Sequence, residues 1–125
     1  MTSQASAAPI LRRGQIVLVE LDPAVGAEQG KTRPAVIVSN DAANAAASQN
    51  AYGVVTIVPL TGNTATIRPY QVLVSAADSG LPRDSKAQAE QLRSVASSRI
   101  VRPLAWLPSH LIEELDEAIR VHLAL

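Results

Sequence analysis

Short apolar runs joined by polar loops constrain the fold of this 125-residue chain more than any other feature. Four such runs, rich in Val, Ile and Leu and short enough for β-strands, lie at residues 15–21, 35–39, 53–61 and 70–75. No helical pattern of crossover length lies between them, which disfavours a doubly wound parallel sheet. Residues 109–125 repeat apolar side chains at helical spacing and predict one long helix, with Ser109 as its N-cap. We therefore expect five or six strands in a small, strongly twisted barrel that is mainly β with a C-terminal α-helix.

The remaining segments carry weaker patterns. Residues 1–9 are small and polar without periodicity, and we expect a disordered tail followed by a single domain over residues 10–125. Residues 40–50 are rich in Ala, but their Asn and Ser content favours a loop. Residues 53–61 are almost continuously apolar, which predicts a strand buried on both faces, with Pro59 at an edge or bulge. Residues 97–107 predict a further short strand or helical turn.

Composition narrows the function classes. The chain has no cysteine, which excludes disulfides and thiolate metal sites. Its net charge is zero, but residues 111–120 carry a local charge of −3, so residues 1–110 carry +3. A mildly positive body suits a short phosphate backbone rather than a broad clamp on duplex DNA. The N-terminus lacks the features of a signal peptide, and no apolar run approaches the ~20 residues that cross a bilayer. We expect a soluble, cytoplasmic protein.

The connection between the first two strands, residues 26–34 (GAEQGKTRP), is longer and denser in charge and amide groups than a hairpin requires. Arg33 precedes Pro34, whose ring favours an extended conformation of the preceding residue and so gives the cationic side chain a fixed base. A guanidinium binds phosphate oxygens through two parallel hydrogen bonds and stays charged at biological pH. From the residues alone, Arg33 is either a phosphate-binding residue or an ordinary surface arginine.

Several familiar catalytic arrangements are missing from the sequence. It contains no GxxxxGK[ST], GxGxxG or HExxH pattern. Both histidines, His110 and His122, lie in the predicted C-terminal helix, where a solvated or partly packed residue is the simpler interpretation. The carboxylates form no pair or triad at metal-ligand spacing. A reaction at the loop therefore has to use Arg, Thr, Glu and amide groups.

Four segments resemble the MazF/PemK family of toxin endoribonucleases. Residues 12–41 are similar to the family's opening pattern, RGDV…L.P..GSEQGG.RPV.I..ND. Residues 54–61 (VVTIVPLT) resemble the family strand that ends in a catalytic threonine. Residues 83–100 (RDSKAQAEQLRSVASSRI) resemble its EQIRT…RL segment, and residues 114–125 (ELDEAIRVHLAL) its terminal helix. The similarity extends from residue 12 to residue 125.

This resemblance implies a small SH3-like barrel that forms a homodimer, with single-stranded RNA in a groove at the dimer interface. It implies sequence-specific cleavage of mRNA, or of tRNA or rRNA, without a metal or another cofactor. The 2′-hydroxyl attacks the adjacent phosphorus and leaves a 2′,3′-cyclic phosphate and a 5′-hydroxyl, which inhibits translation and growth. The resemblance also implies a MazE-like antitoxin whose disordered acidic segment covers the groove.

The resemblance also assigns candidate site residues. The family's catalytic arginine falls on Arg33, which would neutralise charge on the pentacoordinate phosphorane. Its threonine falls on Thr61, which would donate to a phosphate oxygen or orient the 2′-hydroxyl; a strand-end threonine bonded to the backbone is the alternative. Glu28, the one carboxylate in the loop, is the candidate that helps to deprotonate the 2′-hydroxyl. The candidates for RNA contact, of which the last five have an ordinary surface position as the alternative, are Gln29, Gly30, Lys31, Asn40, Ser85, Glu90, Gln91 and Arg93.

Departures from the family pattern affect the RNA sequence that is cut. Lys31 stands where members often have a second glycine, and Ala24 and Val25 stand where some have an aromatic residue. A hydrophobic run is replaced by KAQAEQ, and we expect Lys86, together with Arg83, to lengthen the basic groove. Two rival interpretations stay open. One is a non-catalytic, CcdB-like barrel that poisons DNA gyrase through its C-terminal helix; the other is an inactive homologue that serves as a binding module.

Overall fold

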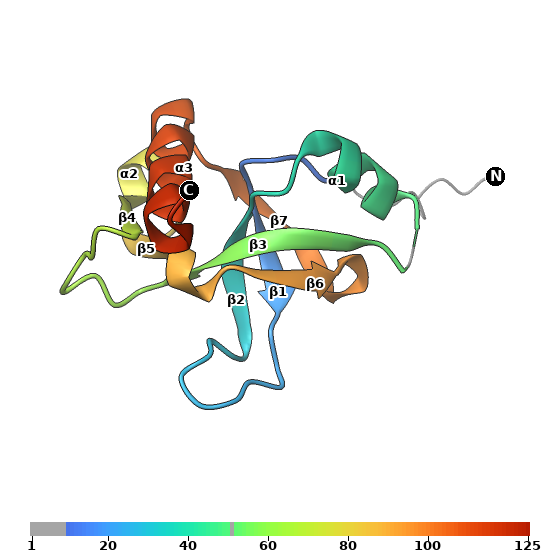
Figure 1. Cartoon of the computed structure of the whole chain (residues 1–125), viewed down its shortest axis with the longest axis horizontal. Coiled ribbons are helices and arrows are strands. Elements are labelled where there is room, and N and C mark those ends of the chain that lie inside the picture. The colour runs from blue at the N-terminus through green and yellow to red at the C-terminus, as the bar shows by residue number, and fades with distance from the viewer. Residues whose placement is uncertain (1–9, 51) are drawn as a thin grey trace.

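The computed structural model describes residues 10–50 and 52–125, so the tail expected over residues 1–9 lies outside the described residues. In this part of the chain one antiparallel sheet contains seven strands: β1 (Gln15–Glu20), β2 (Thr32–Ile37), β3 (Val54–Thr61), β4 (Gln71–Val74), β5 (Ser85–Gln88), β6 (Arg93–Ala96) and β7 (Ile100–Trp106). The helices are α1 (Asp41–Ser48), α2 (Ala76–Ser79) and α3 (Ser109–Leu123), and two 3₁₀ turns are η2 (Ala89–Gln91) and η3 (Ser97–Arg99). The expectation of a mainly β fold with a C-terminal helix is confirmed (Figure 1).

The strand β3 organises the sheet, whose neighbours run in the order β4-β5-β3-β2-β1-β7. The first half of β3 pairs with β6, and its last two residues, Leu60 and Thr61, pair with β5. Pro59 lies between these two paired segments, at the point where this edge of β3 changes its partner. The missing N–H of proline fits such a break in the ladder, although β3 is an interior strand and not the edge that the sequence predicts.

Two apolar clusters cover the two faces of the central strands. Because side chains alternate along a strand, Val58 belongs to the cluster beneath α3 and Ile57 to the cluster that includes Ala47 of α1. Ile57 and Val58 are both 0% exposed, which confirms the prediction that this strand is buried on both sides. Burying a side chain of this size contributes about 1.5–3 kcal/mol. Together the clusters fix the register of the strands that carry the loop of residues 21–31.

Two local expectations are wrong. Residues 40–50 contain the helix α1 rather than a loop, because the side-chain oxygen of Asn40 accepts a hydrogen bond from the N–H of Ala43 at 2.9 Å and caps the helix. Ser109 is the first helical residue of α3, and Pro108 occupies the N-cap position without a side-chain hydrogen bond. The sheet also has one or two strands more than expected, because residues 85–96 form β5 and β6.

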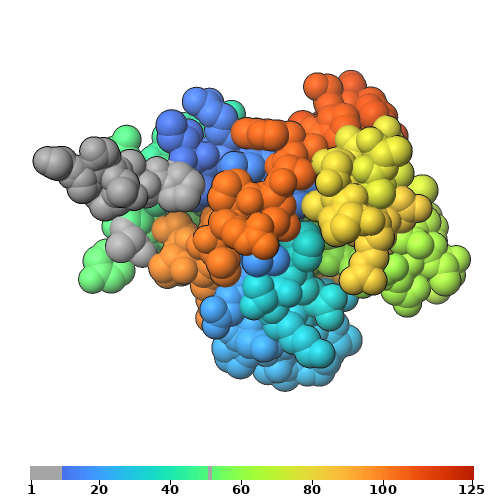
Figure 2. Space-filling view, turned by 180° about the vertical axis from the view of Figure 1, so that it is seen from behind, coloured from blue at the N-terminus to red at the C-terminus, as the bar shows by residue number. Residues whose placement is uncertain are grey.

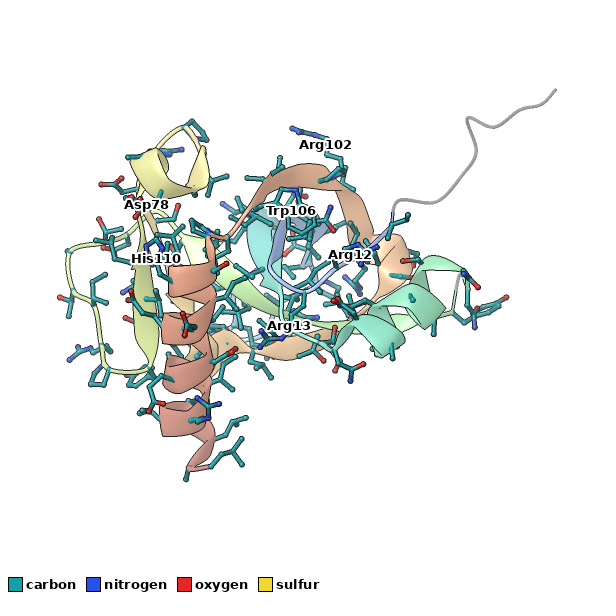
Figure 3. The ribbon with its side chains drawn as sticks, turned by 90° about the horizontal axis from the view of Figure 1, so that it is seen from above. Arg12, Arg13, Asp78, Arg102, Trp106 and His110 are labelled. Carbon is teal, nitrogen blue, oxygen red and sulfur yellow. The ribbon has the colours of Figure 1, made fainter. Side chains whose placement is uncertain are left out.

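The edge strand β7 is irregular. Its pairing with β1 shifts register twice, between Ile16 and Val17 and between Leu18 and Val19. Arg102 and Pro103 are exposed on this strand, and Trp106 is 55% exposed at its end (Figure 3). Bulges, proline and charge are features by which natural sheets protect a free edge from pairing with another chain.

None of the helices among the described residues is both long enough and apolar enough to traverse a bilayer.

Candidate active site

The loop between β1 and β2 projects from the sheet, away from α1 and α3 (Figure 1), and stands out from the molecular surface (Figure 2). Its stem is fixed by polar contacts. The N–H of Lys31 donates to Oδ1 of Asp22 at 2.7 Å, and the carbonyl of Lys31 accepts from the N–H of Leu21 at 2.7 Å. The guanidinium of Arg99 donates to the carbonyls of Glu20 and Asp22 at 3.2 and 2.6 Å. These contacts hold both ends of the loop together.

Three glutamines, Gln29, Gln88 and Gln91, fasten the loop to β5 and η2, and we call them the amide latch. Nε2 of Gln29 donates to Oε1 of Gln88 at 2.8 Å, and the N–H of Gln29 donates to Oε1 of Gln91 at 3.2 Å. Nε2 of Gln91 donates to the carbonyl of Ala27 at 3.2 Å. Gln29 and Gln91 were predicted as RNA contacts, whereas Gln88 was not predicted, because an interior glutamine in a polar run gives no sequence signal.

Arg33 and Thr61 lie at the same end of neighbouring strands. The β2–β3 ladder pairs Ala35 with Pro59, and continuing this antiparallel register by two residues places Arg33 opposite Thr61. Arg33 is half-buried, and its Nε donates to the carbonyl of Gly30 at 2.9 Å. This bond orients the guanidinium through one nitrogen, and among residues 10–50 and 52–125 its two terminal nitrogens have no hydrogen-bond partner, which leaves them for a ligand.

Arg33 and Thr61 line one pocket of about 460 Å³, together with Lys31, Arg83 and Ser85. Among the described residues, the lining of this pocket includes three cationic side chains and no carboxylate. Such a lining attracts an anion, because nothing within it neutralises the positive charge. The Thr61 oxygen accepts only a long hydrogen bond, 3.4 Å from the N–H of Asn63. Its hydroxyl proton has no acceptor among residues 10–50 and 52–125, so the hydroxyl is available as a donor.

The structure does not bring Glu28 into this pocket. Its Oε1 accepts from the N–H of Val25 at 2.8 Å, and the side chain lines a separate pocket of about 240 Å³ with Glu90, Gln91 and Arg93. In that pocket Oε2 of Glu90 accepts from the Gln71 amide at 2.7 Å, and within the described residues Oε1 is buried without a partner.

The predicted site residues therefore divide into groups. Lys31, Arg33, Thr61 and Ser85 meet in the larger pocket, with Gly30 attached through its carbonyl. Asn40 lies seven residues from Arg33, beyond the opposite end of β2, which is roughly 20 Å at about 3.3 Å per residue. The larger pocket also contains Arg83, which was noted from the sequence only for its charge next to Lys86.

The histidines lie on and around α3 rather than at the loop. His110 lies near Asp78 (Figure 3), with Nε2 of the histidine 3.8 Å from Oδ2 of the aspartate. The ring of His122 is 5.9 Å from that of Tyr70. Within the described part of the chain, no three His, Asp or Glu side chains gather as metal ligands. The N–H of Arg13, followed by the Asn44 side chain, lowers the pKa of Asp41 at the start of α1.

Comparisons with known proteins show the family of the chain and its fold. Residues 12–123 match the family described as PemK-like, MazF-like toxin of type II toxin–antitoxin system. The chain is 51% identical over 116 residues to endoribonuclease MazF9 of Mycobacterium tuberculosis (strain ATCC 25618 / H37Rv), an alignment that covers 93% of this chain and 98% of the relative.

Two solved structures share the fold. A crystal structure of MazF from Deinococcus radiodurans matches with a TM-score of 0.77 at 26% identity, covering 94% of this chain and 99% of that one. An endoribonuclease in complex with its cognate antitoxin, from a mycobacterial species, matches with a TM-score of 0.71 at 23% identity, covering 92% and 96% of the two chains. From residue 12 to residue 123, this chain belongs to the family of PemK-like, MazF-like toxins of type II toxin–antitoxin systems.

Proposed function

We propose that this protein is a sequence-specific endoribonuclease toxin that cleaves single-stranded RNA, with mRNA as the substrate and tRNA or rRNA as the alternatives. The observation that carries the proposal is the larger pocket, in which Arg33 and Thr61 stand on neighbouring strands among cations without a carboxylate. Cleavage of messages or of translation RNAs stops protein synthesis and growth. The relative from M. tuberculosis is named an endoribonuclease, which supports the same activity.

The reaction is an intramolecular transesterification. The ribose 2′-oxygen forms a bond to the adjacent phosphorus while the bond from phosphorus to the 5′-oxygen breaks, which gives a 2′,3′-cyclic phosphate and a 5′-hydroxyl. The free terminal nitrogens of Arg33 stabilise the negative charge that gathers on the phosphorane oxygens. The Thr61 hydroxyl donates to one of these oxygens. Because an arginine is a weak acid, the leaving 5′-oxygen takes its proton from water.

Glu28 is the proposed acceptor of the 2′-hydroxyl proton. It belongs to the same loop as Lys31 and Arg33, but its carboxylate is bonded to the N–H of Val25. The role therefore requires Glu28 to exchange this partner when RNA enters. Catalytic hydrogen bonds often form only in the substrate complex, so the geometry without RNA does not decide the assignment.

We further propose a homodimer, with RNA lying in the groove between two copies, and a MazE-like antitoxin that covers this groove. One solved relative is described as a complex with its cognate antitoxin, which supports such a partner. A disordered acidic segment would be attracted by the cationic pocket. The expected compartment is the cytoplasm, where translated RNA is found.

The test is cleavage of single-stranded RNA in EDTA, followed by analysis of the product ends. The wild type should give 2′,3′-cyclic phosphate ends, and Arg33→Ala and Thr61→Ala should each cleave ~10²-fold more slowly, as expected for a lost transition-state donor. Arg102→Ala, an exposed arginine on β7, is the matched control and should cleave at the wild-type rate. Circular dichroism checks that each variant is folded. Full activity of a folded Arg33→Ala would refute the proposed site.

The rival is a CcdB-like barrel that poisons DNA gyrase. It predicts intact RNA in this assay together with inhibited supercoiling by gyrase, and its activity would survive Arg33→Ala.

A further inference from the structure

Lys31 has a backbone conformation that suits a different residue. Its φ of 62° lies in the left-handed region, where a side chain crowds the backbone and glycine does not. The conformation is fixed on both sides, by the N–H bond to Asp22 at 2.7 Å and the carbonyl bond to Leu21 at 2.7 Å. The chain thus has a lysine where glycine would fold with less strain. Residues held in such conformations cluster at functional sites, which makes the Lys31 side chain a candidate for a function.

Arg83 lines the same pocket from the connection between α2 and β5. Leu81 anchors this connection at 8% exposure, and Pro82 restricts the backbone next to Arg83. The neighbouring carboxylate of Asp84 accepts from the N–H of Ala76 at 2.8 Å. Among the described residues, Arg83 forms no ion pair, so its charge is not neutralised.

The charge of the pocket exceeds what one phosphate requires. A phosphodiester carries one negative charge, and its phosphorane carries about two, whereas Lys31, Arg33 and Arg83 supply three positive charges without a carboxylate among the lining residues described. A pocket of about 460 Å³ also falls within the range of sites that enclose a small organic ligand, so it has room for more than one phosphate group.

We propose that Lys31 and Arg83 form a phosphate subsite that holds a phosphodiester next to the one that is cut. This subsite rests on the proposed function, in which Arg33 and Thr61 face the scissile phosphate. The lysine supplies a point charge, and the arginine supplies a planar pair of donors, so the two side chains together bind one phosphate. The subsite positions the strand, because a neighbouring phosphate held there places the adjacent linkage at Arg33 without reading the sequence.

The experiment measures binding of a mixed-sequence, fully 2′-O-methylated RNA oligonucleotide, which lacks the attacking hydroxyl and cannot be cut by this mechanism. The logarithm of the binding constant is plotted against the logarithm of salt concentration, where each phosphate contact on a single strand contributes a slope of about −0.7. The double variant Lys31→Gly/Arg83→Gln should make the slope about 0.7 less steep, which is the contribution of one phosphate, and each single variant should account for part of this change. Lys31→Arg should keep the wild-type slope, and so should Arg102→Ala, which lies outside the pocket.

A second readout separates function from folding. Lys31→Gly should raise the melting temperature, because it relieves the left-handed strain, and it should weaken RNA binding. Lys31→Arg should leave both the melting temperature and RNA binding unchanged. Unchanged slopes in folded Lys31→Gly and Arg83→Gln overturn the subsite. Because the probe is uncuttable, reduced slopes in a protein that cuts no RNA support the subsite and refute the enzyme, whereas unchanged slopes in an active enzyme refute the subsite alone.

Discussion

Replacing Gly30 by alanine tests how the loop positions Arg33. A Cβ at residue 30 would lie 2.6 Å from Oδ1 of Asp22 and 2.9 Å from the Cβ of Ala24. Both distances are shorter than side-chain carbons tolerate, so the loop backbone or the Asp22 side chain has to move. Two bonds depend on this geometry, from the N–H of Lys31 to Asp22 and from Nε of Arg33 to the carbonyl of Gly30.

The two bonds predict effects of different size. Losing the Lys31–Asp22 bond, which is exposed and has a charged acceptor, should lower the free energy of unfolding by about 1.5 kcal/mol. Shifting the carbonyl that orients Arg33 by about 1 Å should lower the rate of RNA cleavage ~10²-fold, the usual effect of such a misplacement. That loss corresponds to about 2.7 kcal/mol in the activation free energy. Activity should therefore suffer more than stability.

The assay combines urea denaturation with single-turnover cleavage of RNA by the same preparation. Gly62→Ala is the control for stability, because a Cβ there meets no atom within 4 Å and the free energy of unfolding should be unchanged. A Gly30→Ala protein that cleaves RNA at the wild-type rate would show that the carbonyl of Gly30 does not position Arg33.

Three further predictions concern the scaffold. Leu115→Ala should lower the free energy of unfolding by about 2–5 kcal/mol in urea denaturation, because Leu115 is only 1% exposed and packs from α3 into the cluster beneath that helix. Asp41→Asn should lower the free energy of unfolding at pH 7, because the N–H of Arg13 stabilises the charged form of Asp41 and lowers its pKa. The difference in unfolding free energy from the wild type should disappear as the pH falls from about 3.9 through this lowered pKa. Urea titrations at several pH values measure this difference. Gln88→Ala removes the acceptor for the Gln29 side chain, which should lower the free energy of local opening of the loop by about 1 kcal/mol. Hydrogen exchange of the backbone amides in residues 22–31, measured by mass spectrometry, should therefore become ~5-fold faster.

The sequence predicts the parts of this fold that rest on local apolar pattern. The buried strand β3 and the amphipathic helix α3 were both expected, because their apolar side chains repeat at the spacing of a strand and of a helix. The expectation that Arg33 and Thr61 lie in one site rests on the family resemblance, because no local pattern in the sequence indicates that their two strands are neighbours.

Polar side chains that are satisfied inside the fold account for the misses. All four residues of β5 are buried, although Lys86 and Gln88 are among them, because Nζ of Lys86 donates to the carbonyl of Thr66 at 2.7 Å and Gln88 belongs to the amide latch. In α1, Asn44 is buried and donates to the carbonyl of Ser39 at 2.8 Å. Such partners are distant in sequence or depend on the final geometry, so composition alone favours a loop at α1 and indicates no strand at β5.

The irregular strand β7 has a consequence for how copies of this protein meet. An incoming strand would need a regular row of main-chain groups along β7. The two shifts of register and the proline make this row irregular, and the exposed Arg102 adds charge to it. Pairing of β7 with a strand of another copy is therefore disfavoured, and so is the growth of fibrils by strand pairing at this edge. Any assembly built on β7 has to rely on side-chain packing, for which the exposed indole of Trp106 supplies the largest apolar surface.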